Sequence, residues 1–251
     1  MQVQIKRVRS LWQRAIACAV LISYVGVLPV NAIAQVVPKG GSGLTVYNNP
    51  NGVPVVNINT ANAAGLSHNQ YTQYNVDGRG LVLNNNPGTS LTAPTNSQLA
   101  GSLLTNTNLA SPARVILNEV VGGARSVLAG YTEVAGARAD VVVANPYGIT
   151  CNGCGFINTS RAALTTGVPV LGADGSLKGY QVSGGDILVT GQGLDGTNPA
   201  LLDLVSRSIM FNGQVNGHDV VVATGNGTFD VSSRVLTPMT TIVDPEIWTR
   251  V

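Results

Sequence analysis

Short runs of apolar, mostly β-branched residues, separated by Gly, Asn or Asp, dominate the chain from about residue 114 onward. Such runs, bounded by turn-forming residues, are typical of β-strands. No segment keeps apolar residues at the 3.6-residue period of an amphipathic helix. The pattern therefore predicts an all-β domain with little helix. The predicted strands cover residues 114–117, 126–129, 140–143, 186–189, 208–211 and 219–222.

A loose repeat in the second half of the chain indicates how these strands are arranged. Segments 164–167, 188–191, 210–213 and 222–225 each end in Gly, and these glycines are 24, 22 and 12 residues apart. Periods in the low twenties fit one coil of a parallel β-helix, in which strands of successive coils stack about 4.8 Å apart. The 12-residue step fits half a coil or a short coil. An antiparallel sandwich, with a turn at roughly every 8–12 residues, stays open as the alternative.

Two turn-rich stretches interrupt the strand pattern. Residues 35–52 hold Gly-Gly-Ser-Gly and Asn-Asn-Pro-Asn-Gly segments and lie where an amino-terminal cap is needed, because a stack of coils exposes an unpaired backbone edge. Residues 89–112 hold two prolines and many Ser, Thr and Asn residues, so they are expected to leave the coil stack.

The first residues have the layout of a secretory signal peptide. Basic residues at positions 6, 7, 9 and 14 precede an apolar run over 15–30, and Ala32-Ile33-Ala34 matches the small-residue pattern that signal peptidase reads. We expect cleavage between Ala34 and Gln35, which leaves 217 of the 251 residues. The apolar run is shorter than the roughly 20 residues that span a bilayer, which favours a cleaved leader over a membrane anchor.

Removal of that leader changes the charge of the chain. Four of the 14 basic residues lie in it and all 12 acidic residues lie beyond it, so the mature chain carries a net charge of −2. Without a basic patch there is no electrostatic footprint for nucleic acid. Charged residues make up 10% of the chain, and 30 Gly and 23 Asn supply much of the remaining polarity. Asn and Gly suit the left-handed corners of stacked β-structure.

Several sequence blocks stand in one order along the chain: 52–58, 67–76, 113–120, 144–149 and 156–167. In this order they resemble the two-partner-secretion domain of filamentous haemagglutinins, haemolysins and contact-dependent inhibition toxins. The resemblance covers about residues 40–225, so we take 35–225 as the domain and 226–251 as an unmatched tail and possible truncation point. It implies a right-handed parallel β-helix with an amino-terminal cap.

The resemblance also implies a function. Proteins of this family in Gram-negative bacteria pass the general export machinery, meet the POTRA domains of a partner outer-membrane barrel and are threaded to the cell surface or the medium. The domain directs translocation of a haemagglutinin, adhesin or toxin and nucleates its β-helix. A neighbouring cell or host-cell surface is a further possible partner. A small stand-alone adhesin, an inactive truncated remnant and a β-helical polysaccharide-degrading enzyme stay open as alternatives.

Two signatures of the family have counterparts here. Asn106, Thr107, Asn108 and Leu109 correspond to Asn-Pro-Asn-Leu with Thr in place of Pro, and Asn145, Pro146, Tyr147, Gly148 and Ile149 correspond to Asn-Pro-Asn-Gly-Ile with Tyr in place of the second Asn. The resemblance implies that the transporter recognises these segments. The same residue types also form turns, so a turn-forming role without any contact to the transporter explains the residues of both segments equally well. Because Asp forms such turns too, we expect Asn145→Asp to keep the fold.

Cys151 and Cys154 resemble the Cys-x-x-Cys of a haemolysin-like and contact-toxin-like subset of the family. In an oxidising compartment this resemblance implies a disulfide, with Asn152 and Gly153 forming the turn between the two cysteines. A redox enzyme would need a βαβ context that is absent, and zinc would need two more ligands, for which only the distant His68 and His218 are available. Carboxylates are scattered singly, so we predict no catalytic site, metal or cofactor.

We predict that the exported protein begins at Gln35. Intact-mass measurement of secreted material checks this, and a mass that retains residues 1–34 contradicts it.

Overall fold

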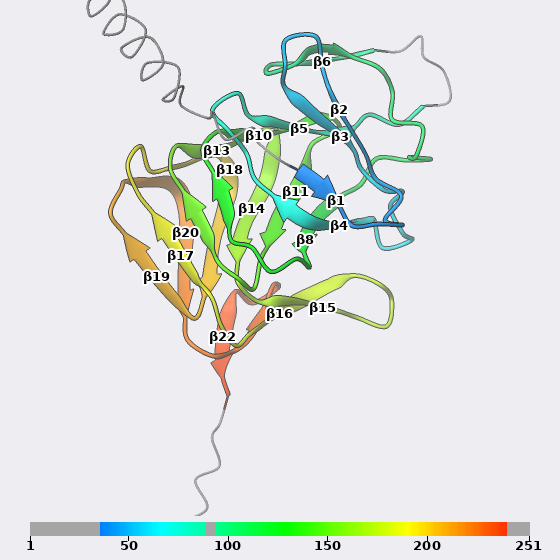
Figure 1. The fold of residues 1–251 in the computed structure, drawn as a ribbon. Coiled ribbons are helices and arrows are strands. Elements are labelled where there is room, and N and C mark those ends of the chain that lie inside the picture. The colour runs from blue at the N-terminus through cyan, green and yellow to red at the C-terminus, as the bar shows by residue number, and fades with distance from the viewer. Residues whose placement is uncertain (1–35, 89–93, 240–251) are drawn as a thin grey trace, which may run out of the picture. The chain divides into compact units, whose positions relative to one another are not determined.

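The computed structural model describes residues 36–88 and 94–239, and every regular element in these ranges is a β-strand. The expected cleavage position between Ala34 and Gln35 lies outside the described residues, as do residues 240–251 at the end of the 226–251 tail. Figure 1 shows the strands in chain order. No helix among the described residues is long and apolar enough to cross a bilayer.

Most strands belong to three faces of parallel strands that stack coil upon coil. The first face contains β4 (Leu66–Tyr74), β8 (Val115–Val120), β11 (Ala139–Ala144), β14 (Thr159–Thr165), the second half of β18 (Leu194–Ser206) and the second half of β20 (Val215–Thr224). The second face contains β3 (Pro54–Asn57), β5 (Leu81–Asn85), β10 (Tyr131–Gly136), β13 (Cys154–Ile157) and the first halves of β18 and β20. The third face contains β9 (Ser126–Leu128), β12 (Ile149–Cys151), β17 (Asp186–Val189) and β19 (Ser208–Phe211).

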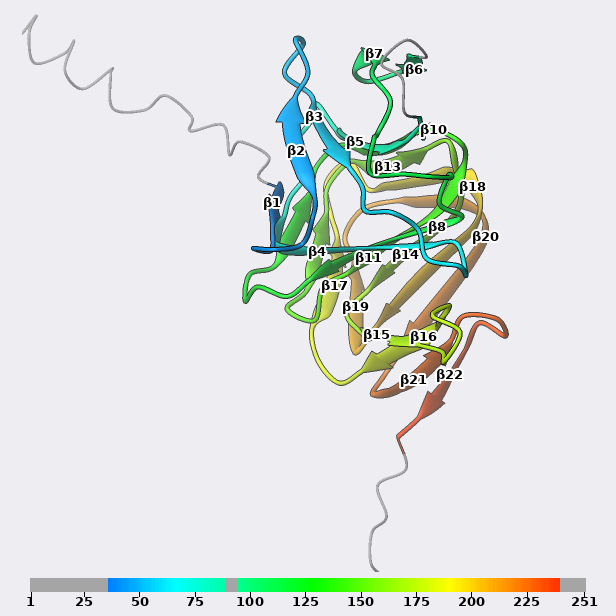
Figure 2. The ribbon, with the colours of Figure 1, turned by 90° about the vertical axis from the view of Figure 1, so that its right-hand side faces the viewer.

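The amino-terminal cap lies where the sequence predicts it. β1 (Val36–Pro38) pairs antiparallel with β4, and β2 (Thr45–Asn48) pairs antiparallel with β3. In Figure 2 these strands lie side by side at one end of the stack. They cover the backbone edge of the first coil, which would otherwise offer unpaired N–H and C=O groups to another chain.

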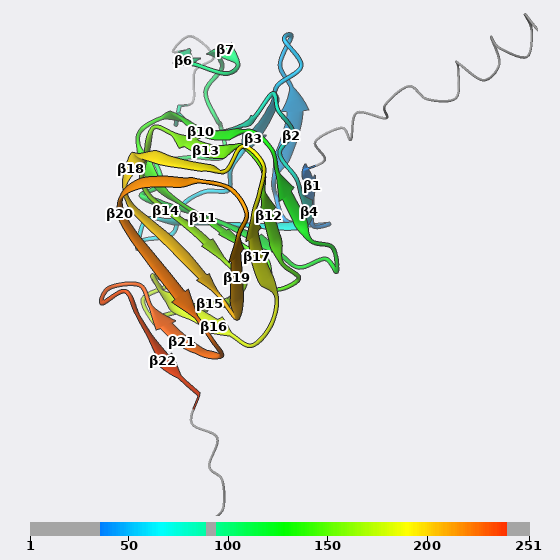
Figure 3. The same ribbon diagram turned by 90° about the vertical axis from the view of Figure 1, so that its left-hand side faces the viewer.

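Strand register explains the glycine repeat. Leu188 pairs with Met210 on the third face, so the 22-residue step is one true coil. Leu164, Leu204 and Val222 instead follow one another on the first face. The 12-residue step from Met210 to Val222 therefore crosses from one face to another, as half a coil does, and Figure 3 shows both stacks. The predicted parallel β-helix is confirmed, with the right-handed winding that parallel crossovers adopt.

Side chains alternate between the inside of the coils and the outer surface. On β11, Val141 and Val143 join the inner cluster, whereas Val142 and Ala144 point outward and are nevertheless buried. A four-stranded antiparallel sheet covers them. It consists of β15 (Val168–Leu171), β16 (Leu177–Val182), β21 (Gly227–Asp230) and β22 (Val235–Pro238).

This covering sheet is fastened to the first face by aromatic packing and by a buried carboxylate. Tyr180 and Phe229 stack with ring centroids 5.9 Å apart and pack against the outward residues of the coils. Asp203, which is fully buried, accepts hydrogen bonds from Arg161 at 2.7 Å and from Arg234 at 2.8 Å. β21 and β22 lie beyond residue 225, the predicted end of the domain. Both strands are nevertheless part of the covering sheet.

The predicted excursion also leaves the coil stack. β6 (Thr95–Ser97) and β7 (Gly101–Leu103) form a separate two-stranded antiparallel sheet, which Figure 2 shows outside the coils. The excursion and the covering sheet lengthen their coils, since Leu66 pairs with Val115 49 residues on and Arg161 pairs with Leu201 40 residues on. Within the described residues the first face therefore has six strands, whereas 217 residues at about 22 residues per coil would make somewhat fewer than roughly ten coils.

We predict that Phe229→Ala destabilises the domain by about 3–5 kcal/mol, because the substitution removes a fully buried ring from the layer under the covering sheet. For a domain of this size the melting temperature should fall by roughly 10 °C or more. Thermal unfolding followed by circular dichroism checks this. Val235→Ala, in the same sheet but 56% exposed, is the control and should change little. An unchanged melting temperature for Phe229→Ala would show that these strands are not part of the cooperative unit.

Candidate functional site

The second signature forms a tight turn between β11 and β12, and its first residue is fully buried. The Asn145 amide donates to the Ala124 carbonyl at 3.0 Å and to Ser126 Oγ at 2.9 Å. Its side-chain oxygen accepts the Tyr147 N–H at 2.9 Å, and its backbone carbonyl accepts the Gly148 N–H at 3.0 Å. Asn145 thus closes its own turn and ties it to the preceding coil.

The first signature has the same geometry although its sequence match is poorer. The Asn106 amide donates to the carbonyls of Ile58 and Asn84, both at 2.9 Å. Its side-chain oxygen accepts the Asn108 N–H at 3.0 Å, and its backbone carbonyl accepts the Leu109 N–H at 3.1 Å. Thr107 is exposed and its side chain takes no part in these hydrogen bonds. The turn therefore forms with Thr in place of proline.

Burial divides each signature in the same way. Asn106 with Leu109, and Asn145 with Ile149, point inward and are buried, whereas Asn108 and Tyr147 point outward. Tyr147 is 52% exposed. In the folded domain only the middle of each turn is therefore open to a partner. Gly148 has a φ of 109°, and a Cβ there would lie 2.7 Å from the Arg125 guanidinium, so this position requires glycine.

This geometry changes the expected effect of Asn145→Asp. An aspartate keeps the acceptor for the Tyr147 N–H but cannot donate to the Ala124 carbonyl, and it places a charge where no side-chain surface is exposed. Burying an unpaired charge is strongly unfavourable. The expectation from turn propensity alone, that the fold tolerates this change, neglects the donor role of the amide.

Cys151 and Cys154 form a disulfide in the structure, with Cα atoms 5.3 Å apart. Cys151 ends β12 on the third face and Cys154 begins β13 on the second, so the bond spans one corner of a coil. Between them Asn152 accepts the Gln192 N–H of the next coil at 3.0 Å. The disulfide stiffens a corner locally rather than joining distant parts of the chain, because its two residues are three positions apart.

The two histidines have structural partners. His68 Nε2 lies 2.7 Å from Glu119, and His218 Nε2 lies 2.9 Å from the Thr197 carbonyl. Among the described residues no group of His, Cys, Asp and Glu is arranged to hold a metal ion. In the described part of the chain neither histidine is grouped with Cys151 and Cys154.

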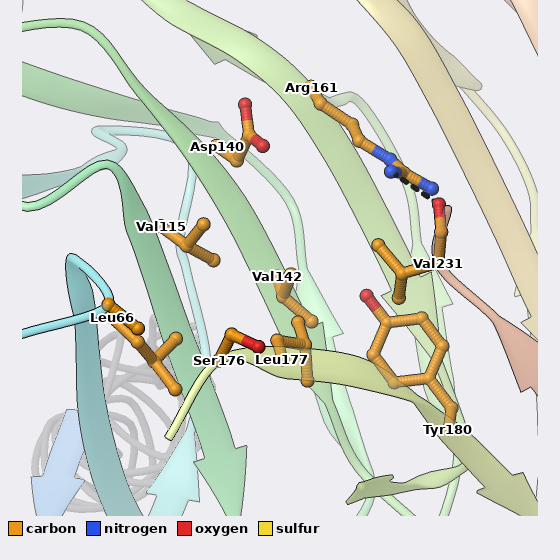
Figure 4. Close-up of a pocket in the computed structure, with 10 residues that line it drawn as sticks. Leu66, Val115, Asp140, Val142, Arg161, Ser176, Leu177, Tyr180 and Val231 are labelled. Carbon is orange, nitrogen blue, oxygen red and sulfur yellow. Dashed lines mark hydrogen bonds between the residues drawn. The ribbon is translucent and has the colours of Figure 1, made fainter. Parts of the chain in front are cut away.

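A small cavity of about 100 Å³ lies between the first face and the covering sheet. Figure 4 shows Leu66, Val115, Val142 and Leu177 lining it, with Asp140 and Arg161 along one side. Arg161 is occupied, because it bonds Asp203 and donates to the Val231 carbonyl at 2.8 Å. Burial raises the pKa of Asp140, and the nearby Arg161 only partly offsets this. The cavity offers one carboxylate, so it lacks the carboxylate pair that glycoside hydrolysis requires.

Comparison with known proteins assigns the family. Residues 34–246 match the TPS secretion domain family over most of the chain. The chain belongs to this family.

Curated relatives agree with this assignment. The chain is similar to "tRNA nuclease CdiA" of Escherichia coli (strain STEC_O31), with 50% identity over 204 residues, and to "Toxin CdiA" of Yersinia pestis, with 42% identity over 217 residues. These matches cover 80% and 84% of this chain but 6% of each relative. The nuclease and toxin activities in these names belong to proteins of which this TPS secretion domain spans only a small part.

A solved structure supports the fold. The filamentous hemagglutinin secretion domain is 35% identical, with a TM-score of 0.72, and the match covers 82% of this chain and 68% of that one. The resemblance inferred from ordered sequence blocks is thereby confirmed. Sequence reasoning missed Asp203 and Glu133, since each is a single acidic residue in a polar or apolar run and belongs to no motif.

We predict that Asp140→Asn raises the melting temperature of this TPS secretion domain by about 1–3 °C at pH 7. The folded pKa of Asp140 lies above its unfolded value, so its contribution to stability is fully present below the unfolded pKa and is lost as pH rises through the folded pKa. The benefit of Asn should therefore shrink as pH falls towards about 4. Thermal melting from pH 4 to 7 checks this.

The exposed Asp174 supplies a control of opposite sign. The Ser176 hydroxyl lowers the pKa of Asp174, so Asp174→Asn should bring no gain at pH 7. A gain for both variants would show a general charge effect instead of the burial of Asp140.

Proposed function

We propose that this chain is the module through which an exported polypeptide engages its own outer-membrane transporter, and that engagement precedes folding. The partner is a barrel with periplasmic POTRA domains, reached after general export and removal of residues 1–34. The product is secreted or displayed at the cell surface. Membership of the TPS secretion domain family supports the secretion role.

The burial of Asn106 and Asn145 is the observation that supports engagement of the transporter before folding. Neither side chain has exposed surface, and each amide nitrogen already makes two hydrogen bonds. A transporter that reads these asparagines must therefore meet them before the coils close. Recognition of the folded domain would be limited to the outward residues Thr107, Asn108 and Tyr147.

The disulfide is compatible with passage of an unfolded chain. Cys151 and Cys154 enclose only two residues, so the bond forms in the periplasm without linking distant segments. A longer cross-link would hold a bulky loop that a narrow barrel could not thread. The loop is short enough that the oxidised chain stays nearly linear.

The last described coil supports a role in nucleating a β-helix. β19 and β20 pair on one side only, with β17 and β18, and their other edges carry no strand among the described residues. Val222, Met210 and Phe211 are each more than 40% exposed at this end. An unpaired parallel edge with apolar side chains is the surface on which a further coil stacks. We infer no catalytic activity for the module itself.

We predict that Asn145→Asp lowers the secreted amount by at least about fivefold, and that Asn118→Asp lowers it much less. Both residues are fully buried asparagines whose amides donate to a carbonyl of a neighbouring coil, Asn145 to Ala124 and Asn118 to Val142. Both substitutions should therefore destabilise the fold similarly, through a lost donor and a buried charge. Only the first changes a signature. Secreted yield with the co-expressed transporter, set beside the melting temperature of each refolded variant, checks this.

Tyr147→Asn provides the complementary variant, because it restores the family signature at an exposed position. It should leave both stability and secreted yield at least as high as in the parent chain. Equal losses for Asn145→Asp and Asn118→Asp at equal stability would overturn the recognition role and leave the signatures as turns.

A further inference from the structure

A polar cleft of about 250 Å³ lies between the excursion and one corner of the coil stack. It is separate from the signature turns and from the cavity beside Asp140. Its lining consists of Thr95, Asn96, Gln98, Glu133, Val134, Gly136, Arg138, Asn158 and Asn198. Two of these residues are charged, Glu133 and Arg138, and four carry side-chain amides. Val134 is the one aliphatic residue in the lining.

The corner of the coils forms one wall of the cleft. Arg138 spans successive coils, since its Nη2 donates to the Thr159 carbonyl at 2.7 Å and to the Asn198 carbonyl at 3.0 Å. Asn158 donates to the Val134 and Gly136 carbonyls, and Asn198 accepts the Thr159 N–H. These bonds fix the three side chains in place. They leave Arg138 Nε and Nη1, the Asn158 side-chain oxygen and the Asn198 amide nitrogen without a partner among the described residues.

The excursion forms the opposite wall. The side-chain amides of Asn96 and Gln98 are exposed and have no hydrogen-bond partner in the described part of the chain. The wall itself is held by Glu133, which is only 3% exposed and accepts Ser97 Oγ at 2.6 Å, the Gln98 N–H at 2.7 Å and the Leu99 N–H at 2.9 Å. The backbone of this wall is therefore fixed, while its two amides stay free for a ligand.

The charges in the cleft select a neutral ligand. Glu133 and Arg138 contribute one negative and one positive charge, so neither an anion nor a cation finds a field of one sign. The unpaired groups on the two walls are five donor nitrogens and three acceptor oxygens, so a ligand must both accept and donate hydrogen bonds. A flat base would need an apolar or aromatic stacking surface, and the lining has no aromatic residue.

We propose that this cleft binds one hexopyranose unit of a neutral saccharide. Each sugar hydroxyl both donates and accepts, which matches a cleft lined by four side-chain amides. A cavity of about 150 Å³ accommodates benzene, so an open cleft of about 250 Å³ has room for a six-membered ring with its hydroxyl groups. Without an aromatic platform the affinity is weak, in the millimolar range typical of a few hydrogen bonds.

The test uses the full exported chain and four methyl hexosides, those of glucose, galactose, mannose and N-acetylglucosamine. Two-dimensional NMR of the side-chain amides gives the readout. At least one glycoside should shift the Asn96, Gln98 and Asn198 amide signals saturably. The double variant Asn96→Ala, Gln98→Ala should weaken this binding by about tenfold or more, because two ligand-facing amides are lost.

Both substituted side chains are exposed and make no hydrogen bond within the described residues, and the backbone bonds of these residues are kept, so the double variant should melt at the temperature of the parent chain. Asn226→Ala with Gln192→Ala, which are likewise exposed but line no part of the cleft, is the matched control and should bind normally. The proposal is overturned if no glycoside shifts these signals at about 50 mM, if the double variant binds as the parent does, or if glucuronate binds the cleft more tightly than methyl glucoside.

Discussion

Buried asparagine side chains at the corners of the coils are the constraint on which the rest of the structure depends. At each corner the chain leaves one face before the next begins, so its backbone groups lose their strand partners. The buried Asn85, Asn106 and Asn145 each donate two hydrogen bonds to backbone or side-chain oxygens at such corners, and the half-buried Asn158 does the same. Buried polar groups left unpaired would be costly. The asparagine content that stands out in the sequence is therefore the means by which corners stack.

The same burial separates two states of the signature turns. In the folded domain Asn106 and Asn145 are buried with their hydrogen bonds satisfied, whereas Thr107, Asn108 and Tyr147 are exposed. In an unfolded chain all of them are accessible. A residue that is visible before folding and hidden afterwards suits a one-way process, because folding at the far side of the membrane removes the segment from the transporter. Under the proposed function, stacking of coils would make return unfavourable without any nucleotide in the periplasm.

Sequence reasoning predicted six of the coil strands (β8, β9, β11, β17, β19 and β20), the cap, the excursion and the family, because each rests on local patterns or on ordered blocks. The glycine repeat correctly indicated a β-helix, although its segments lie on two different faces. Its 22-residue step is one coil on a single face, and its 12-residue step is half a coil from one face to the other. The covering sheet was not predicted. Its strands alternate only weakly, and the pairing of β16 with β21 joins residues nearly fifty positions apart. The paired arginines of Asp203 likewise come from segments that no local pattern connects.

Binding of isolated POTRA domains to the chain in its native and unfolded states tests the central claim most directly. The native chain is compared with the same chain kept unfolded by a destabilising substitution such as Phe229→Ala in mild denaturant, under identical solvent conditions. The account predicts binding to the unfolded chain that Asn145→Asp weakens, and little binding to the native domain. Equal or tighter binding to the native domain, unaffected by unfolding, would contradict it.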